Sequence, residues 1–427
     1  MIRAFVATFL LLFSLNQALF AQELTLSPYS RYGVGDIFNT SSTRNAAMGG
    51  IGVATDNYFS VNRINPASYA DMLFTTLDIS GFGQYSQLRT RTDSENQLTS
   101  GFQNLSLGFP TNKKLALAIG FSPYSAVGYN ISSQRQVMLD TLRTEVTNYQ
   151  GQGGLNQAFM GMASRMLKDR LRLGANLHYT FGNTNYAREA LLLTDVANSQ
   201  PVLVQEDIFV GGLGWQGGFI FADTVLKKKN VIFRLGGTID YTTKLKGSRV
   251  IIMNNDRVVD TIRNEEGFIR LPSQYGVGLM LHRPGHWSLG ADLMYQNWAA
   301  LDYFSETPSL GTETRISIGG EWIPEFDGRR YFKRVRYRLG AYHRESYISV
   351  NNEKVGDTGF TFGLGFPASL KGSSRFDIGR SSSQINLAFL IGKRGSLSAN
   401  LPLEEFYVRM RVGINLNDRW FVRRVVD

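Results

Sequence analysis

The chain has 427 residues, no Cys, 44 Gly and a formal net charge of +10, and its mean hydropathy of −0.15 is slightly polar. The lack of Cys excludes disulfide frameworks, Cys-ligated metals, thiol nucleophiles and a lipid anchor on Cys. A basic chain can bind nucleic acid, but Lys and Arg are spread through strand-like segments without a basic helix or zinc-finger spacing. No nucleic-acid partner is therefore expected.

The N-terminus is typical of a secretory signal peptide. Arg3 supplies a positive start, an apolar run extends from Ala4 to Leu15, and a cleavage point follows Ala21. The run is shorter than the ~20 apolar residues that a membrane-spanning helix needs, although an N-terminal anchor is the alternative. Residues 1–21 are predicted to be a signal peptide, and the mature chain is predicted to be exported.

Residues 22–71 are predicted to form an N-terminal extension, rich in Gly, Ala and Asn between Arg44 and Met72. The segment has weak periodicity and precedes the first clear strand pattern, so it is a nucleotide-binding loop, a linker or a plug. GGIGVA lacks the G-x-G-x-x-G spacing, a following Lys-Ser/Thr and a surrounding βαβ unit. The same argument excludes GGLGWQGG, residues 211–218, as a phosphate loop.

Residues 72–416 alternate between apolar and polar side chains with a period of two. The apolar face carries Leu, Val and terminal aromatics, and the other face mixes Arg, Asp, Glu and Gly; clear runs are RLRLGANLHYTFG (170–182), HWSLGADLMYQNW (286–298), RISIGGEW (315–322) and YVRMRVGINL (407–416). Alternation of this length predicts half-exposed strands, and a polar lumen within an apolar, aromatic-girdled wall is typical of an outer-membrane barrel. We predict an all-β fold: one transmembrane antiparallel β-barrel of about 14 strands. A secreted β-sandwich is the alternative.

Turn signals divide the alternating segments. HRPGHW (282–287) predicts a tight turn, and IMNNDRVV (252–259) predicts a hairpin. Longer polar segments at Gln87–Ser100 and Asp140–Gly154 are interpreted as outer loops. Residues 417–427 are predicted to be a short C-terminal tail.

Catalytic and metal-binding patterns are weak. The four His residues, 178, 282, 286 and 343, lack the H-E-x-x-H or clustered spacing of a metal site, and no Ser is placed convincingly beside His343 for nucleophilic catalysis. The sequence predicts no enzyme, no metal site, no catalytic residue and no cofactor.

A set of arginines is predicted to face the lumen, where charge tunes selectivity. Its members are Arg172, Arg234, Arg315, Arg336, Arg338, Arg409 and Arg411. Some of them could bind a carboxylate head group by bidentate pairing. Alternatively they form an internal ion-pair lattice with Asp240, Asp292 and Glu321 that braces the barrel.

The segment from Arg44 to Met72 resembles the N-terminal hatch of FadL-like outer-membrane transporters, which carry long-chain fatty acids and aromatic hydrocarbons. The resemblance rests on Arg44, AMGGIGVA (47–54) and NPAS (65–68), and the ending DRWF with a basic tail resembles a Bacteroidota-type divergent group. It implies a 14-stranded barrel with this segment as a luminal hatch. The hatch or gating candidates are Met48, Gly49, Gly50, Gly52, Asn65, Pro66 and Ala67. Two roles of this segment are consistent with the sequence: it gates the lumen, or it simply fills it.

Two functions follow from this interpretation. The first is passive transport of hydrophobic or amphipathic, fatty-acid-like molecules across the outer membrane. The alternative is a non-transporting accessory or scaffold barrel of an outer-membrane protein assembly or secretion complex. The expected partners are outer-membrane lipid, a hydrophobic small-molecule cargo and proteins of the outer-membrane machinery.

Overall fold

The computed structural model of the chain describes residues 24–38, 40–112, 114–138, 142–193, 200–242, 244–255, 258–326, 328–368, 383–398 and 401–418. The predicted signal peptide and most of the predicted C-terminal tail lie outside these residues. In the described residues no helix has the length and hydropathy of a membrane span.

In the described residues, eighteen strands form one sheet. They are β1 (Asp36–Ile37), β2 (Thr75–Arg89), β3 (Ser94–Pro110), β4 (Leu115–Met138), β5 (Leu142–Met166), β6 (Leu171–Leu193), β7 (Val202–Leu226), β8 (Val231–Thr242), β9 (Lys244–Asn254), β10 (Val259–Arg270), β11 (Gln274–Arg283), β12 (Trp287–Asn297), β13 (Asp302–Tyr303), β14 (Thr312–Trp322), β15 (Arg336–Val350), β16 (Glu353–Ala368), β17 (Ser383–Gly395) and β18 (Glu404–Asp418). The helices are short: η1 (Pro28–Arg31), α2 (Thr43–Ala46), η2 (Pro66–Asp71), η3 (Lys227–Lys229), η4 (Trp298–Ala300) and α3 (Tyr331–Arg334).

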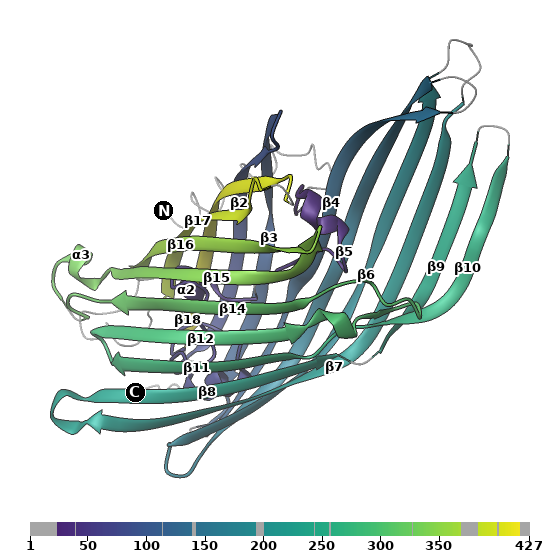
Figure 1. Cartoon of the computed structure of the whole chain (residues 1–427). Coiled ribbons are helices and arrows are strands. Elements are labelled where there is room, and N and C mark those ends of the chain that lie inside the picture. The colour runs from purple at the N-terminus through teal and green to yellow at the C-terminus, as the bar shows by residue number, and fades with distance from the viewer. Residues whose placement is uncertain are drawn as a thin grey trace, which may run out of the picture.

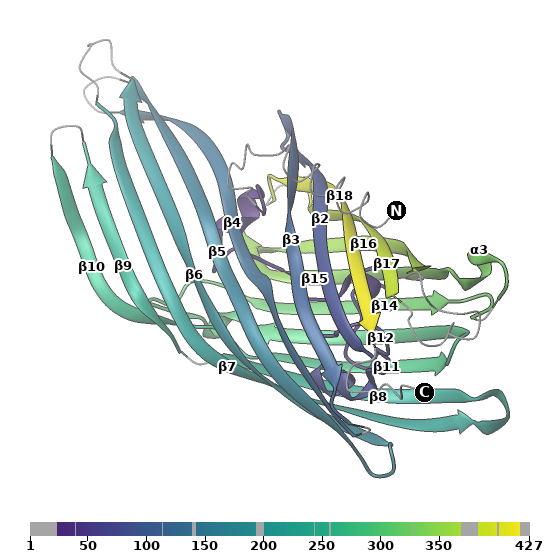
Figure 2. The same cartoon turned by 180° about the vertical axis from the view of Figure 1, so that it is seen from behind.

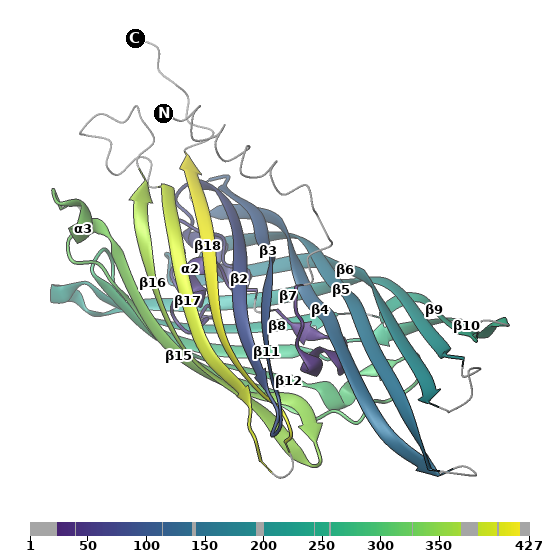
Figure 3. The same cartoon turned by 90° about the horizontal axis from the view of Figure 1, so that it is seen from above.

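The sheet closes because β18 pairs antiparallel with β2. β7 pairs with β8 along one half of its length and with β9 along the other. β8 and β9 are therefore successive parts of one long barrel strand, and so are β10 and β11. Counted in this way, without the two-residue strands β1 and β13, the fold is a closed antiparallel barrel of 14 strands, as predicted. Figure 3 shows the ring from above, with the purple N-terminal segments inside it.

The outer surface of the barrel carries the predicted apolar face. On β14, Ile316 and Ile318 are more than half exposed, whereas Glu321 is buried toward the lumen. Aromatic side chains lie at both edges of this band: Trp287 is opposite Trp322 at one edge, and Tyr275 is opposite Tyr295 at the other. Trp287 and Tyr295 are eight positions apart, which is about 27 Å along the strand; with the ~40° tilt of outer-membrane strands this corresponds to roughly 20 Å of height, near the ~25 Å of an apolar band.

We call the end of the barrel where β2 begins and β18 ends the hatch end, and the opposite end the hairpin end. At the hairpin end, strands β4 to β7 are 23 to 25 residues long and extend well past the ends of β12, β14 and β15 (Figure 1). Most of the two segments interpreted as outer loops belongs instead to strands β3 and β5 at this end of the barrel. Outside the membrane both faces of a strand meet water, so hydrophobic alternation disappears and a strand resembles a loop in the sequence.

The wall separates at two places toward the hairpin end. β3 pairs with β4 only between Leu105–Pro110 and Ala116–Phe121. The chain around Pro272 interrupts the strand formed by β10 and β11, and beyond this point the β9–β10 hairpin stands apart from β12 and β14 (Figure 1). Proline has no N–H to donate to a ladder, which accounts for the break.

The N-terminal segment Leu24–Phe38 fills the first separation. β1 pairs with β4 at Ser125 and Ala126, and Figure 2 shows the purple segment between β3 and β4. A Cβ added to Gly101 on β3 would lie 2.1 Å from Leu24 Cδ2, so the two chains are in tight contact. The N-terminal chain is thus part of the wall as well as of the lumen.

Candidate functional site

Residues Ser41–Met72, which we call the hatch segment, lie inside the ring of strands. Ser42 caps α2 by accepting a hydrogen bond from Asn45 N at 3.3 Å. The segment then contacts opposite sides of the barrel: α2 packs on β16 to β18, and η2 packs on β4 to β7. Almost all of its side chains are buried, so the segment occupies the cross-section of the barrel at the hatch end.

The glycine-rich part of the hatch segment is pressed against the wall. Gly49 and Gly50 have φ of +70° and +82°, which favours glycine. A Cβ on Gly49 would lie 2.6 Å from the carbonyl oxygens of Ile318 and Ala341. The wall also lacks a side chain at this point: a Cβ on Gly340 would lie 2.2 Å from Gly49 N. Glycines of hatch and wall therefore allow backbone-to-backbone contact.

Hydrogen bonds join the hatch backbone to wall side chains. Gly49 N donates to Thr361 Oγ1 at 2.8 Å. Gly52 N and Val53 N donate to one carboxylate oxygen of Asp292 at 2.6 and 2.9 Å. Met48, another gating candidate, is fully buried.

The NPA motif contacts β7 and β8. Asn65 Nδ2 donates to Val53 O at 2.7 Å, to Phe219 O at 3.0 Å and to Gly237 O at 3.3 Å. Its Oδ1 caps η2 by accepting from Ala67 N at 3.0 Å, and Pro66 occupies the first helical turn. The motif thus anchors the end of the hatch segment.

Asp71, directly after this motif, forms a buried ionic cluster. Arg234 Nη2 lies 2.5 Å and Arg172 Nε 2.8 Å from its carboxylate oxygens. Burial raises the pKa of Asp71, but the two guanidiniums offset this effect and hold the pKa below its ordinary value of 3.8. The carboxylate is therefore charged at neutral pH, and the sequence prediction did not include it.

A second ionic cluster surrounds Arg44. Its Nη2 lies 3.0 Å from Asp56 Oδ1 and 3.0 Å from Glu321 Oε1, and Glu321 also pairs with Arg338 at 2.7 Å. Burial raises the pKa of Asp56, and the charge of Arg44 more than offsets this, so the pKa is lowered. This chain of charges links the hatch segment to β14 and β15.

The seven predicted luminal arginines divide into two groups. Arg172, Arg234 and Arg338 form ion pairs with Asp71 or Glu321. Within the described residues, no ion pair to a carboxylate is found for the other four, Arg315, Arg336, Arg409 and Arg411. Of the three acids considered for the lattice, Asp292 accepts from hatch N–H groups and Asp240 lies 3.6 Å from His178. The lattice therefore extends over only part of the lumen.

A second closure lies toward the hairpin end, and no sequence pattern predicted it. We call it the outer plug: Leu24–Phe38 together with residues 298–304. Its apolar cluster includes Tyr29, Val34, Trp298, Leu301 and Phe304, packed on residues of β5, β7, β9, β10, β15 and β16. Trp298 stacks on Tyr347 with ring centroids 4.4 Å apart.

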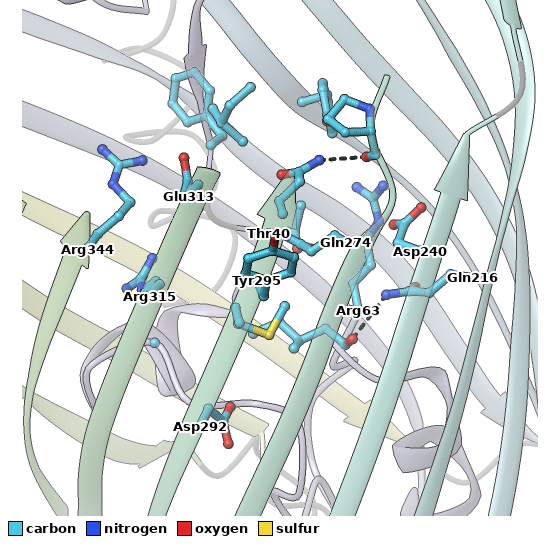
Figure 4. A pocket seen from close by; sticks show the side chains of 18 of the residues that line it. Thr40, Arg63, Gln216, Asp240, Gln274, Asp292, Tyr295, Glu313, Arg315 and Arg344 are labelled. Carbon is cyan, nitrogen blue, oxygen red and sulfur yellow. Dashed lines mark hydrogen bonds between the residues drawn. The ribbon is translucent and has the colours of Figure 1, made fainter. Parts of the chain in front are cut away.

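Between the hatch segment and the outer plug lies a polar chamber. It is lined by Gly50, Arg63 and Ile64 of the hatch segment, by Ile37 and Phe38 of the outer plug, and by wall residues. Figure 4 shows that Asp240, Asp292, Glu313, Arg315 and Arg344 surround it. Its volume is about 100 Å³. About half of the lining residues carry charged or amide side chains, so the chamber suits water and ions better than a hydrocarbon.

The histidines do not form a common site. His178 and His282 are buried on separate strands, near Asp240 and Asp56 respectively, each at 3.6 Å. His343 is on the outer surface, 2.7 Å from Thr358 Oγ1. No group of three or more metal-ligating side chains is found in the described part of the chain.

The chain is similar to known outer-membrane proteins. The model of the BamG family matches residues 1–427, and no curated protein matches. A Pseudomonas aeruginosa FadL homologue aligns with a TM-score of 0.60 at 10% identity, covering 90% of this chain and 100% of that chain. The Pseudomonas putida toluene transporter TodX gives 0.57 at 14%, covering 89% and 98%. The Ralstonia pickettii toluene transporter TbuX gives 0.57 at 14%, covering 88% and 98%. The chain therefore has the FadL-type outer-membrane barrel fold that its hatch motif suggested.

Proposed function

The chain belongs to the BamG family, and we propose that it acts as a non-transporting accessory barrel within an outer-membrane protein assembly. The observation that carries this proposal is the double closure of the lumen. An ionic hatch fills one end, an apolar plug fills the other, and a charged chamber separates them. The charged side chains of this chamber, among them Arg63, Asp240 and Asp292, are unfavourable surroundings for a hydrophobic cargo.

The interactions that hold the hatch segment and the outer plug in place favour permanent closure of the lumen. Removing one partner of a buried ion pair costs about 3–5 kcal/mol, and moving the hatch segment would separate both Asp71 and Arg44 from the wall. A shut lumen leaves the outer surfaces and the tall strands β4 to β7 for contact with other proteins. The proposal includes the partners predicted from the sequence, which are proteins of the outer-membrane machinery. It also includes the assignment of the chain to a Bacteroidota-type group.

The test uses an engineered disulfide that fixes the hatch segment to the barrel wall. The chain has no Cys, so Thr43→Cys with Gly413→Cys introduces a single pair, at a place where a Cβ added to Gly413 would lie 2.8 Å from Thr43 Cβ. The two Cβ atoms must separate by about 1 Å to reach disulfide geometry. Cells carrying the oxidised barrel should retain the same stoichiometric protein partners after gentle extraction and grow as they do with the reduced barrel. Loss of function on locking would contradict a scaffold.

Passive transport of hydrophobic molecules, the first function predicted from the sequence, is the second candidate. Its support is the shared fold with hydrocarbon channels and an apolar pocket of about 370 Å³ at the hatch end, lined by Tyr58, Phe59, Leu73 and Phe326 among others. Liposomes containing the barrel should then take up a radiolabelled fatty acid or toluene faster than protein-free liposomes. The oxidised Thr43–Gly413 cysteine pair should abolish that uptake, and reduction should restore it.

A further inference from the structure

We propose that the lumen contains a binding site for a small oxyanion of the phosphate or sulfate class, formed by Arg315, Arg409 and Arg411. The site lies in a cavity next to the polar chamber, with which it shares Ile37, Phe38, Gly50, Arg315 and Arg344. We call this cavity the arginine pocket. The inference does not depend on whether the barrel is a scaffold or a transporter.

The first argument is an imbalance of charge. The arginine pocket is lined by five arginines, at 315, 344, 394, 409 and 411, and by three carboxylates, at 36, 357 and 405. Arg344 pairs with Asp357 at 3.1 Å and Arg394 with Asp36 at 2.7 Å. The third carboxylate, Glu405, accepts from Ser27 and Ser86 hydroxyls at 2.7 and 3.2 Å. The lining itself therefore holds two more positive charges than negative ones. Because Glu313 and Asp292 of the adjoining chamber lie near Arg315, the excess falls on Arg409 and Arg411.

The second argument is the isolation of Arg411. Its side chain is 1% exposed, and Nη1 makes its hydrogen bonds, both at 3.4 Å, to the carbonyl and hydroxyl oxygens of Ser41. Nε is buried without a hydrogen-bond partner. An ionised group removed from water is strongly destabilised unless an opposite charge accompanies it. A bound anion supplies that charge.

Arg409 and Arg315 add donors to the same pocket. Arg409 donates from Nε to Gln84 at 2.6 Å and lies over the Phe82 ring at 5.2 Å. Arg315 donates to Gly49 O and to Ser317 Oγ, at 3.0 and 3.2 Å, and lies over the Tyr342 ring at 4.5 Å. All of these partners are neutral. Each guanidinium has five N–H donors, so both retain donors for a ligand.

The chemistry of the ligand follows from the donors and the space. Guanidinium groups bind oxyanions bidentately and with directional hydrogen bonds, whereas chloride offers no such geometry. The arginine pocket has a volume of about 80 Å³. About 10–15 Å³ on this scale holds one water, so a tetrahedral oxyanion fits.

The experiment uses the full chain refolded from urea into detergent, so that the probe can enter while the lumen forms. Inorganic phosphate and sulfate are the probes, and chloride at the same ionic strength is the reference. We expect equilibrium dialysis with ³²P-phosphate to give saturable binding, and phosphate and sulfate to raise the thermal midpoint more than chloride. Chloride raising the midpoint equally, or an absence of saturable binding, would overturn the proposal.

Variants separate a binding role from a structural role. Arg411→Met should weaken phosphate binding at least tenfold, and without oxyanion it should be at least as stable as the native chain because it removes an uncompensated charge. Arg135→Gln, at an exposed arginine of the hairpin end, should bind as the native chain does. If Arg411→Met does not refold, Arg409→Gln serves instead. Unchanged phosphate binding in the Arg411 or Arg409 variant would reject the site.

Discussion

The hatch segment and the outer plug close the same lumen with different balances of forces. Buried ion pairs of Arg44 and Asp71 and backbone hydrogen bonds to Asp292 are prominent in the hatch, whereas stacked and buried apolar side chains are prominent in the outer plug, beside one ion pair between Asp36 and Arg394. Ionic contacts require specific geometry and depend on pH, whereas apolar packing depends mainly on volume. The comparison therefore predicts that the two closures fail under different perturbations.

Reporter cysteines make the comparison measurable because the native chain has no Cys. Ala47→Cys reports on the hatch segment and Val34→Cys on the outer plug, since both side chains are buried. Maleimide labelling of each reporter measures local opening, and urea unfolding in detergent measures global stability. Each variant below should increase labelling in its own region; equal labelling of both would show that the two closures open together.

The largest effect is expected for Gly49→Val. The new side chain must adopt positive φ and meets two wall carbonyl oxygens. Backbone strain and overpacking together should cost on the order of 5 kcal/mol and strongly increase labelling at position 47. Gly83→Val is the control, because a Cβ there meets no atom within 4 Å. Equal stability of the two variants would refute the tight contact.

Asp71→Asn should destabilise the chain by about 3–5 kcal/mol at pH 7, since Arg172 and Arg234 lose their counter-charge. The folded pKa of Asp71 is lowered from 3.8, so its stabilisation is present above about pH 4 and is lost as pH falls through the folded pKa. Urea titrations should therefore show a difference from the native chain at pH 7 that shrinks below pH 4. Asp223→Asn, in an exposed pair with Arg170, should cost less than about 1 kcal/mol.

Trp298→Ala should cost about 3 kcal/mol through loss of burial and stacking in the outer plug. Labelling should increase at position 34 and stay unchanged at position 47, and the cost should be the same at pH 7 and pH 4. The matched control is Trp322→Ala, on the outer surface of the barrel. A pH-dependent cost would show that Trp298 acts through the Asp36–Arg394 ion pair of the outer plug and not through apolar packing.

Asn65→Ala should have the smallest effect, about 2 kcal/mol, from the loss of its hydrogen bonds to Val53 and the wall. Hydrogen exchange at η2 should accelerate. Asn65→Asp retains the capping oxygen but loses the amide donor, so it should remain as destabilised as Asn65→Ala. Recovery of stability in Asn65→Asp would assign the whole effect to the cap.

The sequence by itself determined the barrel, its lipid face and the location of the hatch motif. Period-two alternation from Leu171 to Phe181, or from Val408 to Leu416, is imposed locally because one face meets lipid and the other meets the lumen. Positive-φ glycines and the Asn-Pro turn are local signals too. Alternation disappears above the membrane, so the outer parts of β3 and β5 resembled loops.

Only the tertiary structure decided which luminal charges meet. Asp71 pairs with arginines about 100 and 163 residues away, and Arg411 is left without a carboxylate although Asp36, Asp357 and Glu405 line the same pocket. The outer plug combines Tyr29 with Trp298 and Leu401, which no local pattern connects. These partners come from distant strands that closure of the barrel brings together. The balance of charge in the lumen is therefore a property of the closed barrel.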